Sequence, residues 1–383
     1  MKIGIITCWQ PDDNYGTQIQ CFALQTYLKQ LGHEVFLIRY HRFEDLNLKR
    51  ITLNRLLKVF NPYFLARWFL SQLSALLQAD EMKLHNRNAP DFREKYLCMT
   101  RDYMTYQDLA DNPPDADIYI VGSDQVWNIG YEQENNLNAH FLNFGGSKVK
   151  KISYAASFGF EFRVLNKNYT QKARPLLEKF TGISVRETSG IEILKAIGIQ
   201  SGIQVCDPTM LLSANDYNNA FKNEKISLPM KKYVLVYELV AKSDLNIKEI
   251  KNWAKKQKLE VVYITGHGKR TREERFFATI PEWVSFIANA EYVITNSFHG
   301  TVFSLLFHRQ VVVYMLKGGA SSTNSRISTL EKMCEKGLIV KKASDFPKIL
   351  QEKVDWNIFE KNKEELRKTG IDFLQKHLDL GKN

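Results

Sequence analysis

Several features of secreted, metal-binding and membrane proteins are missing from this 383-residue sequence. It has only five cysteines, an odd number, and they lie far apart without forming a CxxC pair. Neither a disulfide framework nor a zinc site is therefore indicated. We expect reduced, mostly buried thiols, no metal site and no bound cofactor.

Long apolar runs are also missing. No run approaches the roughly 18 residues of a membrane-spanning helix. The first residues, MKIGIITCW, pass directly into an apparent strand without the apolar region and cleavage site of a signal peptide. We therefore expect a cytoplasmic protein. The sequence also has no internal repeat and no low-complexity segment.

Basic residues are in excess, with 53 Lys and Arg against 42 Asp and Glu, a net charge of +11 and a pI near 9.2. This balance favours an anionic partner, such as a phosphorylated substrate, an anionic membrane face or a nucleic acid. The charge alone does not distinguish these partners. The sequence has no helix-turn-helix, RRM or zinc-finger pattern, which argues against nucleic acid. Its length predicts two domains, each with a core of its own.

Residues 291–308, EYVITNSFHGTVFSLLFH, join a β-branched apolar run to an apolar helical run through a short polar loop. In an open α/β sheet such a loop lies at the carboxyl end of a strand, where ligands bind, and the helix N-terminus favours an anion. We predict that His299 faces the ligand, with Asn296 and Ser297 lining the site. The alternative is that His299 caps the helix or fills the core.

The N-terminal residues predict a βαβ unit, with strands at 2–8 and 34–39 around a helix at 17–31. It lacks the GxGxxG signature of dinucleotide-binding proteins. Asn14 and Tyr15, in the loop after the first strand, are candidate acceptor-binding residues. Gly16 is a weak phosphate-loop signal, and a turn that suits a helix start explains it equally well.

Residues 117–122 predict another buried strand, which ends in Ser-Asp-Gln-Val-Trp-Asn. A carboxylate, amides and an indole grouped at the end of a strand are typical of a carbohydrate-binding loop. We therefore predict a catalytic role for Asp124 and acceptor binding by Gln125, Trp127 and Asn128. Helix capping by Ser123 or Asp124 is the alternative.

Arginines follow two further predicted strands. Arg186 ends the strand at 183–187, where an anion clamp competes with an ordinary salt bridge, and its planar fork suits a carboxylate or phosphate. The loop 317–326 is rich in glycine and hydroxyl side chains and carries Lys317 and Arg326. Such a loop can wrap an anion with backbone N–H groups.

The domain boundaries follow from these patterns. We predict a Rossmann-like domain over 1–214 with a helical insertion at about 45–95, a linker over 215–232, a second Rossmann-like domain over 233–345 and a helical tail over 346–383. Within the insertion, residues 49–78 mix Arg and Lys with Leu, Phe and Trp at helical spacings. This segment predicts amphipathic helices, which either pack on the core or rest on an anionic membrane.

Six motifs in order resemble those of the polysaccharide pyruvyl transferases: NYGTQIQCFALQTYLKQLGHEV, YIVGSDQVWN, ISYAASFG, SVRETSG, VCDPTMLL and VITNSFHGTVFSLLF. The resemblance implies an α/β fold of two Rossmann-like domains facing across a cleft, as in glycosyltransferases of the B type (GT-B). It also implies transfer of the enolpyruvyl group of phosphoenolpyruvate onto two sugar hydroxyls as a cyclic ketal, with loss of phosphate. The acceptor would be a surface polysaccharide precursor, carried on a polyprenyl diphosphate at the inner membrane face.

The resemblance places His299 on the family histidine, Arg186 on an arginine after the fourth strand and Asp124 on an acidic position. Several members carry an arginine two residues before the histidine, where this chain has Ser297. An anionic donor still needs countercharge, so we expect Arg326, with Lys317, to supply it. In this scheme His299 acts as the acid and Asp124 positions or deprotonates an acceptor hydroxyl.

Two other functions remain open from the sequence. A nucleotide-sugar-dependent glycosyltransferase of the same fold would also use a basic cleft, there to bind a sugar diphosphate. A nucleic-acid binder would explain the net charge and would show a steep salt dependence of its affinity.

Overall fold

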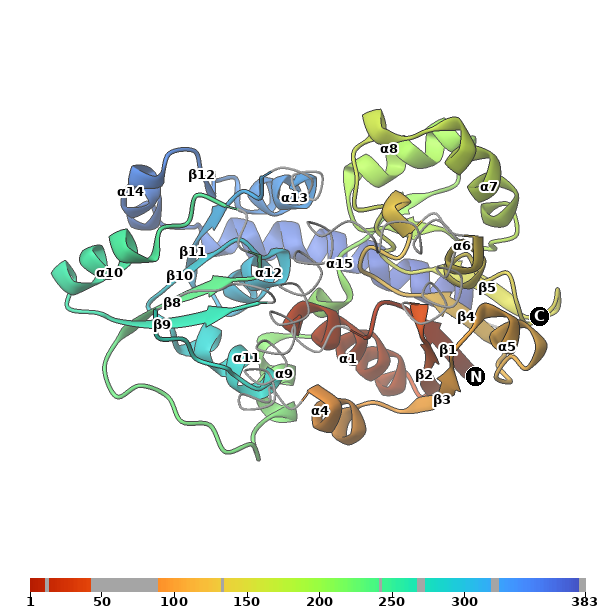
Figure 1. Ribbon diagram of the computed structural model, residues 1–383, viewed down its shortest axis with the longest axis horizontal. Coiled ribbons are helices and arrows are strands. Elements are labelled where there is room, and N and C mark those ends of the chain that lie inside the picture. The colour runs from red at the N-terminus through yellow and green to blue at the C-terminus, as the bar shows by residue number, and fades with distance from the viewer. Residues whose placement is uncertain are drawn as a thin grey trace, which may run out of the picture.

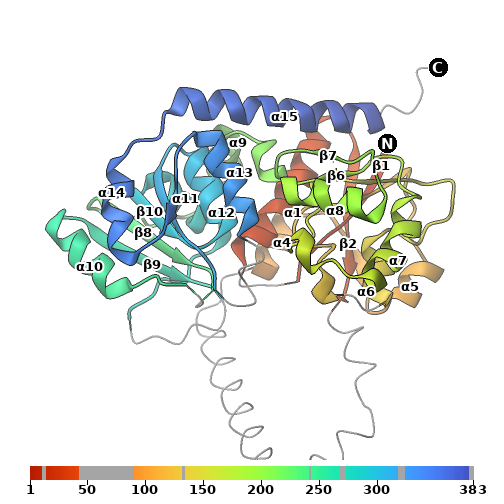
Figure 2. The same ribbon diagram turned by 90° about the horizontal axis from the view of Figure 1, so that it is seen from above.

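The structure, a computed structural model, describes residues 1–10, 14–42, 89–131, 134–240, 243–266, 273–317 and 324–378. The segment 49–78, predicted as amphipathic helices, lies outside these residues. Two five-stranded sheets stand side by side, each in a domain of its own, and the long helix α15 (Trp356–Leu378) runs along both (Figures 1 and 2). The paired strands within each sheet are parallel.

The N-terminal domain contains the sheet with strand order β3-β2-β1-β4-β5. Its order is that of Rossmann folds, and isolated parallel bridges extend its β5 edge toward β6. The elements are β1 (Lys2–Ile6), α1 (Tyr15–Gln30), β2 (Glu34–Tyr40), α4 (Ala89–Tyr96), β3 (Met99–Tyr103), α5 (Tyr106–Asp111), β4 (Ile118–Val121), η2 (Ile129–Tyr131), α6 (Glu134–His140), β5 (Lys150–Ser153), η3 (Phe162–Val164), α7 (Lys167–Leu177), β6 (Ser184–Val185), α8 (Thr188–Ile197), β7 (Ile203–Gln204) and η4 (Pro208–Met210).

The C-terminal domain contains the sheet with strand order β12-β11-β10-β8-β9, the order of flavodoxin-like folds. Its strands are near-continuous runs of buried Val, Ile, Leu and Tyr, as expected for a sheet with both faces covered. The elements are β8 (Tyr233–Glu238), α10 (Ile247–Lys256), β9 (Glu260–Thr265), α11 (Ile280–Asn289), β10 (Tyr292–Thr295), α12 (Phe298–Leu306), β11 (Gln310–Tyr314), α13 (Ser325–Cys334), β12 (Ile339–Val340), η6 (Ala343–Asp345) and α14 (Phe346–Gln351).

Residues 215–232, predicted as a linker, begin inside a helix, α9 (Ala214–Ala220). Tyr217 of this helix is fully buried and contacts both Phe22 of the N-terminal domain and Phe303 of the C-terminal domain. The start of the connection is therefore packed between the domains, and the chain becomes irregular only after it.

One apolar cluster runs through both domains. It includes Ile5 and Tyr15 from the N-terminal domain together with Leu235, Trp283 and Phe303 from the C-terminal domain. Two further clusters each belong to one domain and lie on the outer side of its sheet. The continuous cluster means that the two domains share buried apolar surface, whose removal from water is the main stabilising term at their interface.

Helix α15 joins the domains a second time. Gly370 allows it to approach the Tyr154 hydroxyl, since a Cβ there would lie 2.5 Å from that oxygen. Arg367 donates to the Leu211 carbonyl at 3.1 Å, and Lys150 donates to the His377 carbonyl at 3.3 Å. The predicted helical tail thus packs back across the N-terminal domain (Figure 2).

The cysteines and the helices of the described residues bear on two smaller expectations from the sequence. All five cysteines are free thiols, and four of them are buried, with only Cys98 exposed. Within the described part of the chain, no helix is both long and apolar enough to cross a bilayer.

Candidate active site

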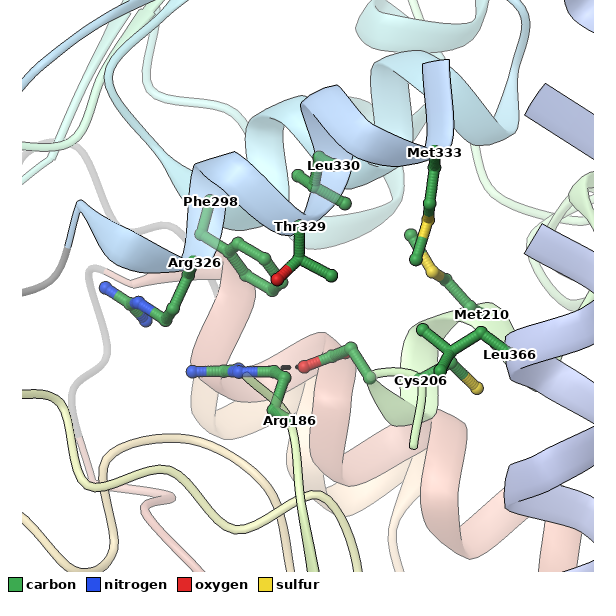
Figure 3. Close-up of a pocket in the computed structure, with 10 residues that line it drawn as sticks. Arg186, Cys206, Met210, Phe298, Arg326, Thr329, Leu330, Met333 and Leu366 are labelled. Atoms are coloured by element: carbon green, nitrogen blue, oxygen red, sulfur yellow. Dashed lines mark hydrogen bonds and ion pairs between the residues drawn. The ribbon is translucent and has the colours of Figure 1, made fainter. Parts of the chain in front are cut away.

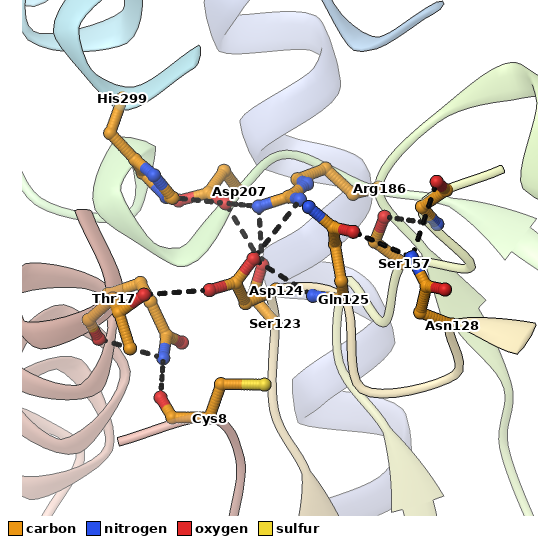
Figure 4. A network of polar contacts seen from close by, with 12 residues as sticks. Cys8, Thr17, Ser123, Asp124, Gln125, Asn128, Ser157, Arg186, Asp207 and His299 are labelled. Atoms are coloured by element: carbon orange, nitrogen blue, oxygen red, sulfur yellow. Dashed lines mark hydrogen bonds and ion pairs between the residues drawn. The ribbon is translucent and has the colours of Figure 1, made fainter. Parts of the chain in front are cut away.

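The predicted functional loops meet between the two sheets. In each open sheet, ligands are expected where the strand order reverses, outside the carboxyl ends of the strands. In the N-terminal sheet this point lies between β1 and β4, and Asp124 follows β4; in the C-terminal sheet it lies between β8 and β10, and His299 follows β10. Side chains from both points gather in one polar network (Figure 4).

His299 lies in the first turn of α12. Ser297 caps this helix by accepting a hydrogen bond from the Gly300 N–H at 3.2 Å, which fixes the turn that carries the histidine. The imidazole is buried, and its Nε2 lies 3.5 Å from Oδ2 of Asp207 in the other domain. Its opposite edge packs against Gly16, where a Cβ would lie 2.1 Å from His299 Nδ1.

Asp207 is the carboxylate at the centre of the network. It accepts hydrogen bonds from Arg186 Nη1 at 2.8 Å, from Ser123 Oγ at 2.9 Å, and from the Thr209 backbone N–H at 3.0 Å and hydroxyl at 2.7 Å. Burial alone would raise the pKa of this carboxyl, but His299 and Arg186 together hold it well below its usual range. Asp207 is therefore a buried anion.

Arg186 is fully buried among acidic groups. Besides its bond to Asp207, it lies 3.7 Å from Glu187 and 4.0 Å from Asp124. Burial opposes its charge, but these three carboxylates outweigh burial and raise the pKa of Arg186. Its Nε and Nη2 have no hydrogen-bond partner among the described residues, although both are buried. These two nitrogens face the carboxylates of Glu187 and Asp124 at ion-pair distance only.

Arg326 approaches the same place from the C-terminal domain, in the first turn of α13. Its guanidinium lies 5.5 Å from the centroid of the Phe298 ring, and that of Arg186 lies 4.6 Å from the same centroid. Burial, and then the neighbouring charge of Arg186, lower the pKa of Arg326 to about 10. Two buried guanidiniums that repel each other form a site that an anion would stabilise.

A pocket opens beside the two arginines (Figure 3). One side carries Arg186, Arg326 and Asp207, and the rest of the wall is largely apolar. Its empty volume is about 270 Å³, including the part open to solvent. Its two guanidiniums beside an otherwise apolar wall suit a small anion. The remaining lining residues are Cys206, Met210, Phe298, Thr329, Leu330, Met333 and Leu366.

Asp124 lies on the acceptor side predicted from the sequence. Its backbone has a φ of 72°, a left-handed conformation that non-glycine residues adopt at a cost, often at functional sites. The carboxylate accepts from the Thr17 hydroxyl at 3.0 Å and the Gln125 N–H at 2.9 Å. Burial would raise its pKa, but Arg186, His299 and Arg326 outweigh burial and lower it.

The other predicted donor-binding residues have partners within the protein. Asn296 accepts from the Leu239 N–H at 2.7 Å and donates to the Val240 carbonyl at 2.7 Å, which ties the end of β10 to the end of β8. Ser297 serves as the cap of α12 described above. Lys317 is exposed and pairs with Asp244 at 2.6 Å. These three positions shape the loops or lie at the surface.

Two of the predicted acceptor-binding residues are buried. The Trp127 indole is fully buried, stacks on Phe141 at 5.1 Å, and donates to the His140 carbonyl at 3.0 Å. Tyr15 is also buried and donates to the Ala278 carbonyl at 2.8 Å. Neither side chain is placed to contact an acceptor. The expectation from the sequence is corrected here, because each polar tip has a backbone partner inside the protein.

The remaining three candidates belong to the loops around the site. Asn14 caps α1 by accepting from the Thr17 N–H at 3.3 Å. Asn128 donates to Gln125 Oε1 at 2.7 Å, so the two amides form a pair beside Gly159. These amides lie at the edge of the network on the N-terminal domain (Figure 4).

Sequence reasoning missed three residues of the site. Asp207 lies within the motif VCDPTMLL, and its signal was a carboxylate directly after a strand. Gly16 was noted only as a turn or phosphate-loop glycine, whereas it makes room for His299. Phe298 carried no signal, because an aromatic residue at a helix start is more often part of a core.

The fold belongs to a known class. The structure resembles the UDP-GlcNAc 2-epimerase of Methanocaldococcus jannaschii in complex with UDP-GlcNAc and UDP, with a TM-score of 0.52 and 14% identity over 98% of this chain and 100% of that one. A second UDP-N-acetylglucosamine 2-epimerase structure gives a TM-score of 0.52 and 10% identity over 100% and 97% of the two chains. Identities this low establish the fold alone, which is of the GT-B type.

The family is established from the sequence. The family described as "Polysaccharide pyruvyl transferase" matches residues 14–316, which is most of the chain. The protein therefore belongs to this family, as its motifs predicted, and is an enzyme that transfers pyruvate onto polysaccharide. No curated protein matches the chain significantly.

Proposed function

We propose that the enzyme uses phosphoenolpyruvate as its donor and forms a cyclic ketal on two hydroxyls of a saccharide acceptor. The observation that supports this donor is the pair of buried guanidiniums on Phe298, which line a small pocket near His299. Phosphoenolpyruvate is a small anion with a carboxylate and a phosphate, and each group suits a planar arginine fork.

The reaction sets the roles that the site must fill. C2 of the donor forms bonds to two sugar oxygens, its bond to the phosphate oxygen breaks, and C3 gains a proton to become a methyl group. Of the two protons that leave the sugar hydroxyls, one is balanced by the proton on C3 and the other by the proton taken up by phosphate. The site therefore needs an acid, a base and cationic groups for the leaving phosphate.

The residues present suit these roles. We assign protonation of C3 to His299, and binding of the donor carboxylate and phosphate to Arg186 and Arg326. Asp124 is ionised and accepts from Thr17, so it is the group assigned to orient or deprotonate an acceptor hydroxyl. The two domains each contribute: the acid and one arginine come from the C-terminal domain, and the other arginine and Asp124 come from the N-terminal domain.

Incubation with phosphoenolpyruvate and candidate saccharides tests the donor. We expect phosphate release together with a product whose mass corresponds to a pyruvyl ketal. A parallel incubation with UDP-sugars tests the alternative of a nucleotide-sugar glycosyltransferase, and turnover in that arm alone would overturn the proposal. His299→Gln should lower kcat on the order of 10²-fold or more, the usual effect of losing a general acid. Near-normal turnover of this variant would remove His299 from the chemistry.

We extend the proposal to an acceptor carried on a polyprenyl diphosphate at an anionic membrane face. The support is the net charge of +11 and the basic, aromatic segment 49–78 of the sequence. Flotation with anionic vesicles at low and high salt tests this. We expect the protein to bind anionic vesicles at low salt, and this binding to be lost when Arg50, Arg55, Lys58 and Arg67 are changed to Glu. Vesicle binding that is unaffected by these four substitutions would overturn the extension.

A further inference from the structure

The two oxygens of Asp207 have different surroundings. Oδ1 accepts from the backbone N–H and the hydroxyl of Thr209, two residues along the chain, and so caps the short helix η4. Oδ2 accepts from Ser123 and Arg186 and faces His299 Nε2 at 3.5 Å. One oxygen is therefore used to hold the residue in place, and the other is directed at groups of the active site.

The hydrogen bonds at Oδ1 fix the direction of the carboxylate. Its side chain is only 1% exposed, so it has little freedom to turn toward solvent. A buried carboxylate with several donors stays ionised and rigid, because leaving any donor or acceptor unpaired there is costly. Asp207 thus presents a fixed negative charge to the imidazole.

His299 faces this carboxylate from the opposite domain. Among the described residues its Nε2 has no hydrogen-bond partner, and Oδ2 of Asp207 lies at the long limit of such a bond. Catalytic hydrogen bonds are often long without substrate and shorten when it binds. The ring is confined on its other edge by Gly16, also from the N-terminal domain.

We propose that Asp207 is a positioning residue for His299: it orients the imidazole across the domain interface for the donation of a proton to C3. This inference rests on the proposed function, in which His299 is the acid. A carboxylate that faces one ring nitrogen orients the imidazole, and a hydrogen bond formed there when substrate binds would fix the position of the ring proton. The acid is therefore complete only when both domains are in contact.

The contact between Asp207 and Arg186 makes the inference specific. The negative charge of Asp207 partly neutralises Arg186, so it weakens the attraction of this arginine for an anionic donor. Removing that charge should leave the affinity for phosphoenolpyruvate unchanged or increase it. A positioning role therefore predicts a large loss of kcat without a rise in KM for the donor, whereas general damage to the site would raise KM as well.

The test compares Asp207→Asn, His299→Gln and the double variant at saturating acceptor. We expect Asp207→Asn to lower kcat on the order of 10²-fold without raising the KM for phosphoenolpyruvate, and the double variant to be no slower than His299→Gln. If Asp207 acts through His299, its effect disappears once the imidazole is gone. Losses that multiply in the double variant, or a kcat within threefold of wild type for Asp207→Asn, would overturn the inference.

Two further variants keep the test valid if Asp207→Asn does not fold, as judged by its thermal melting curve. Ser123→Ala removes one hydrogen bond from Oδ2 and also the contact of Ser123 Oγ with Arg186 Nη1 at 3.2 Å. It should lower kcat, and the part of this loss that acts through Asp207 should disappear in the His299→Gln background. Thr209→Val is the matched control on Oδ1, because the backbone N–H still holds that oxygen, and it should change kcat less than Ser123→Ala. The reverse order of these two effects would contradict the inference.

The wild-type enzyme separates this inference from the proposed function. If it does not turn over phosphoenolpyruvate with any acceptor, the proposed function and the inference both fail. If it does turn over phosphoenolpyruvate and Asp207→Asn behaves as wild type, the inference alone fails.

Discussion

The phenol ring of Tyr15 lies parallel to the indole of Trp283, with their centroids 5.4 Å apart and an angle of 6° between their planes, although the two residues belong to different domains. Tyr15 also meets Tyr237 edge-on and donates to the Ala278 carbonyl. It begins α1, and the next residue, Gly16, touches His299. The contact that joins the domains is therefore adjacent to the contact that positions the histidine.

Tyr15→Ala should destabilise the protein by about 3–5 kcal/mol, because it leaves a cavity in the shared core. Tyr15→Phe keeps the ring and loses the hydrogen bond to the Ala278 carbonyl, which is worth about 1 kcal/mol. Urea unfolding of the two variants measures the difference. Equal stability of Tyr15→Ala and Tyr15→Phe would mean that the ring contributes little to the domain interface.

Arg326→Gln should weaken binding of phosphoenolpyruvate by roughly 2–5 kcal/mol, the range for a desolvated charge pair. Arg326→Lys should recover only part of this affinity, because an ammonium cannot form the planar two-bond contact. Calorimetric titration at fixed ionic strength measures both.

Lys332→Gln is the control for net charge, since Lys332 is exposed on the same helix. The affinity of this variant for phosphoenolpyruvate should match that of wild type. If Arg326→Gln binds the donor as well as Lys332→Gln does, the donor clamp lies elsewhere.

Acid should destabilise the protein through Asp207. Its pKa in the folded state lies below the usual aspartate value of about 3.9, so the ionised form stabilises the fold. This stabilisation is complete above about pH 4 and is lost as the pH falls toward the folded-state pKa. The free energy of unfolding, measured from pH 6 to pH 2.5, should therefore decrease below pH 4.

Asp207→Asn should be less stable at pH 6 and lose less stability on acidification. Asp372→Asn, an exposed change on α15, should keep the wild-type pH dependence. If the free energy of unfolding of Asp207→Asn falls with decreasing pH as steeply as that of wild type, other carboxylates cause the destabilisation by acid.

The strand, loop and helix around His299 were predictable because their signals are local. The apolar run over 292–294 and the helical spacing after Gly300 identify β10 and α12 directly, and both are confirmed. The carboxyl ends of parallel strands lie on one edge of a sheet, and ligands bind there in this fold class. The prediction that the loops after β4 and β10 bind ligand therefore followed from the fold class.

The partners of these loops were not predictable, because they depend on tertiary contacts. Asp207 and His299 meet only because the end of β7 and the start of α12 face each other across the interface. Trp127 was predicted to bind a ligand because its neighbours in the sequence are polar. In the structure its indole instead packs in the core against Phe141. Alternation of residues in a short loop does not determine which side chain points into the core.

Gly16→Ala tests how closely the two domains position the histidine. The added methyl would lie 2.1 Å from His299 Nδ1, far inside van der Waals contact, so the imidazole has to move. Alanine is the better helix former by about 1 kcal/mol, which offsets part of the strain and should keep the variant folded. We expect a fall in kcat on the order of 10²-fold, since a displacement of about 1 Å at a reacting group has effects of this size.

Gly337→Ala is the matched control, because a methyl there meets only Glu331, at 3.9 Å, and its kcat should equal that of wild type. The same kinetic assay is applied to both variants after their melting temperatures have been compared. If Gly16→Ala folds and its kcat stays within threefold of that of Gly337→Ala, the position of the His299 ring against α1 is not required for turnover. The three atoms nearest to the added methyl all belong to His299. The effect of Gly16→Ala on the KM for phosphoenolpyruvate should therefore be small, which distinguishes a displaced acid from a damaged donor site.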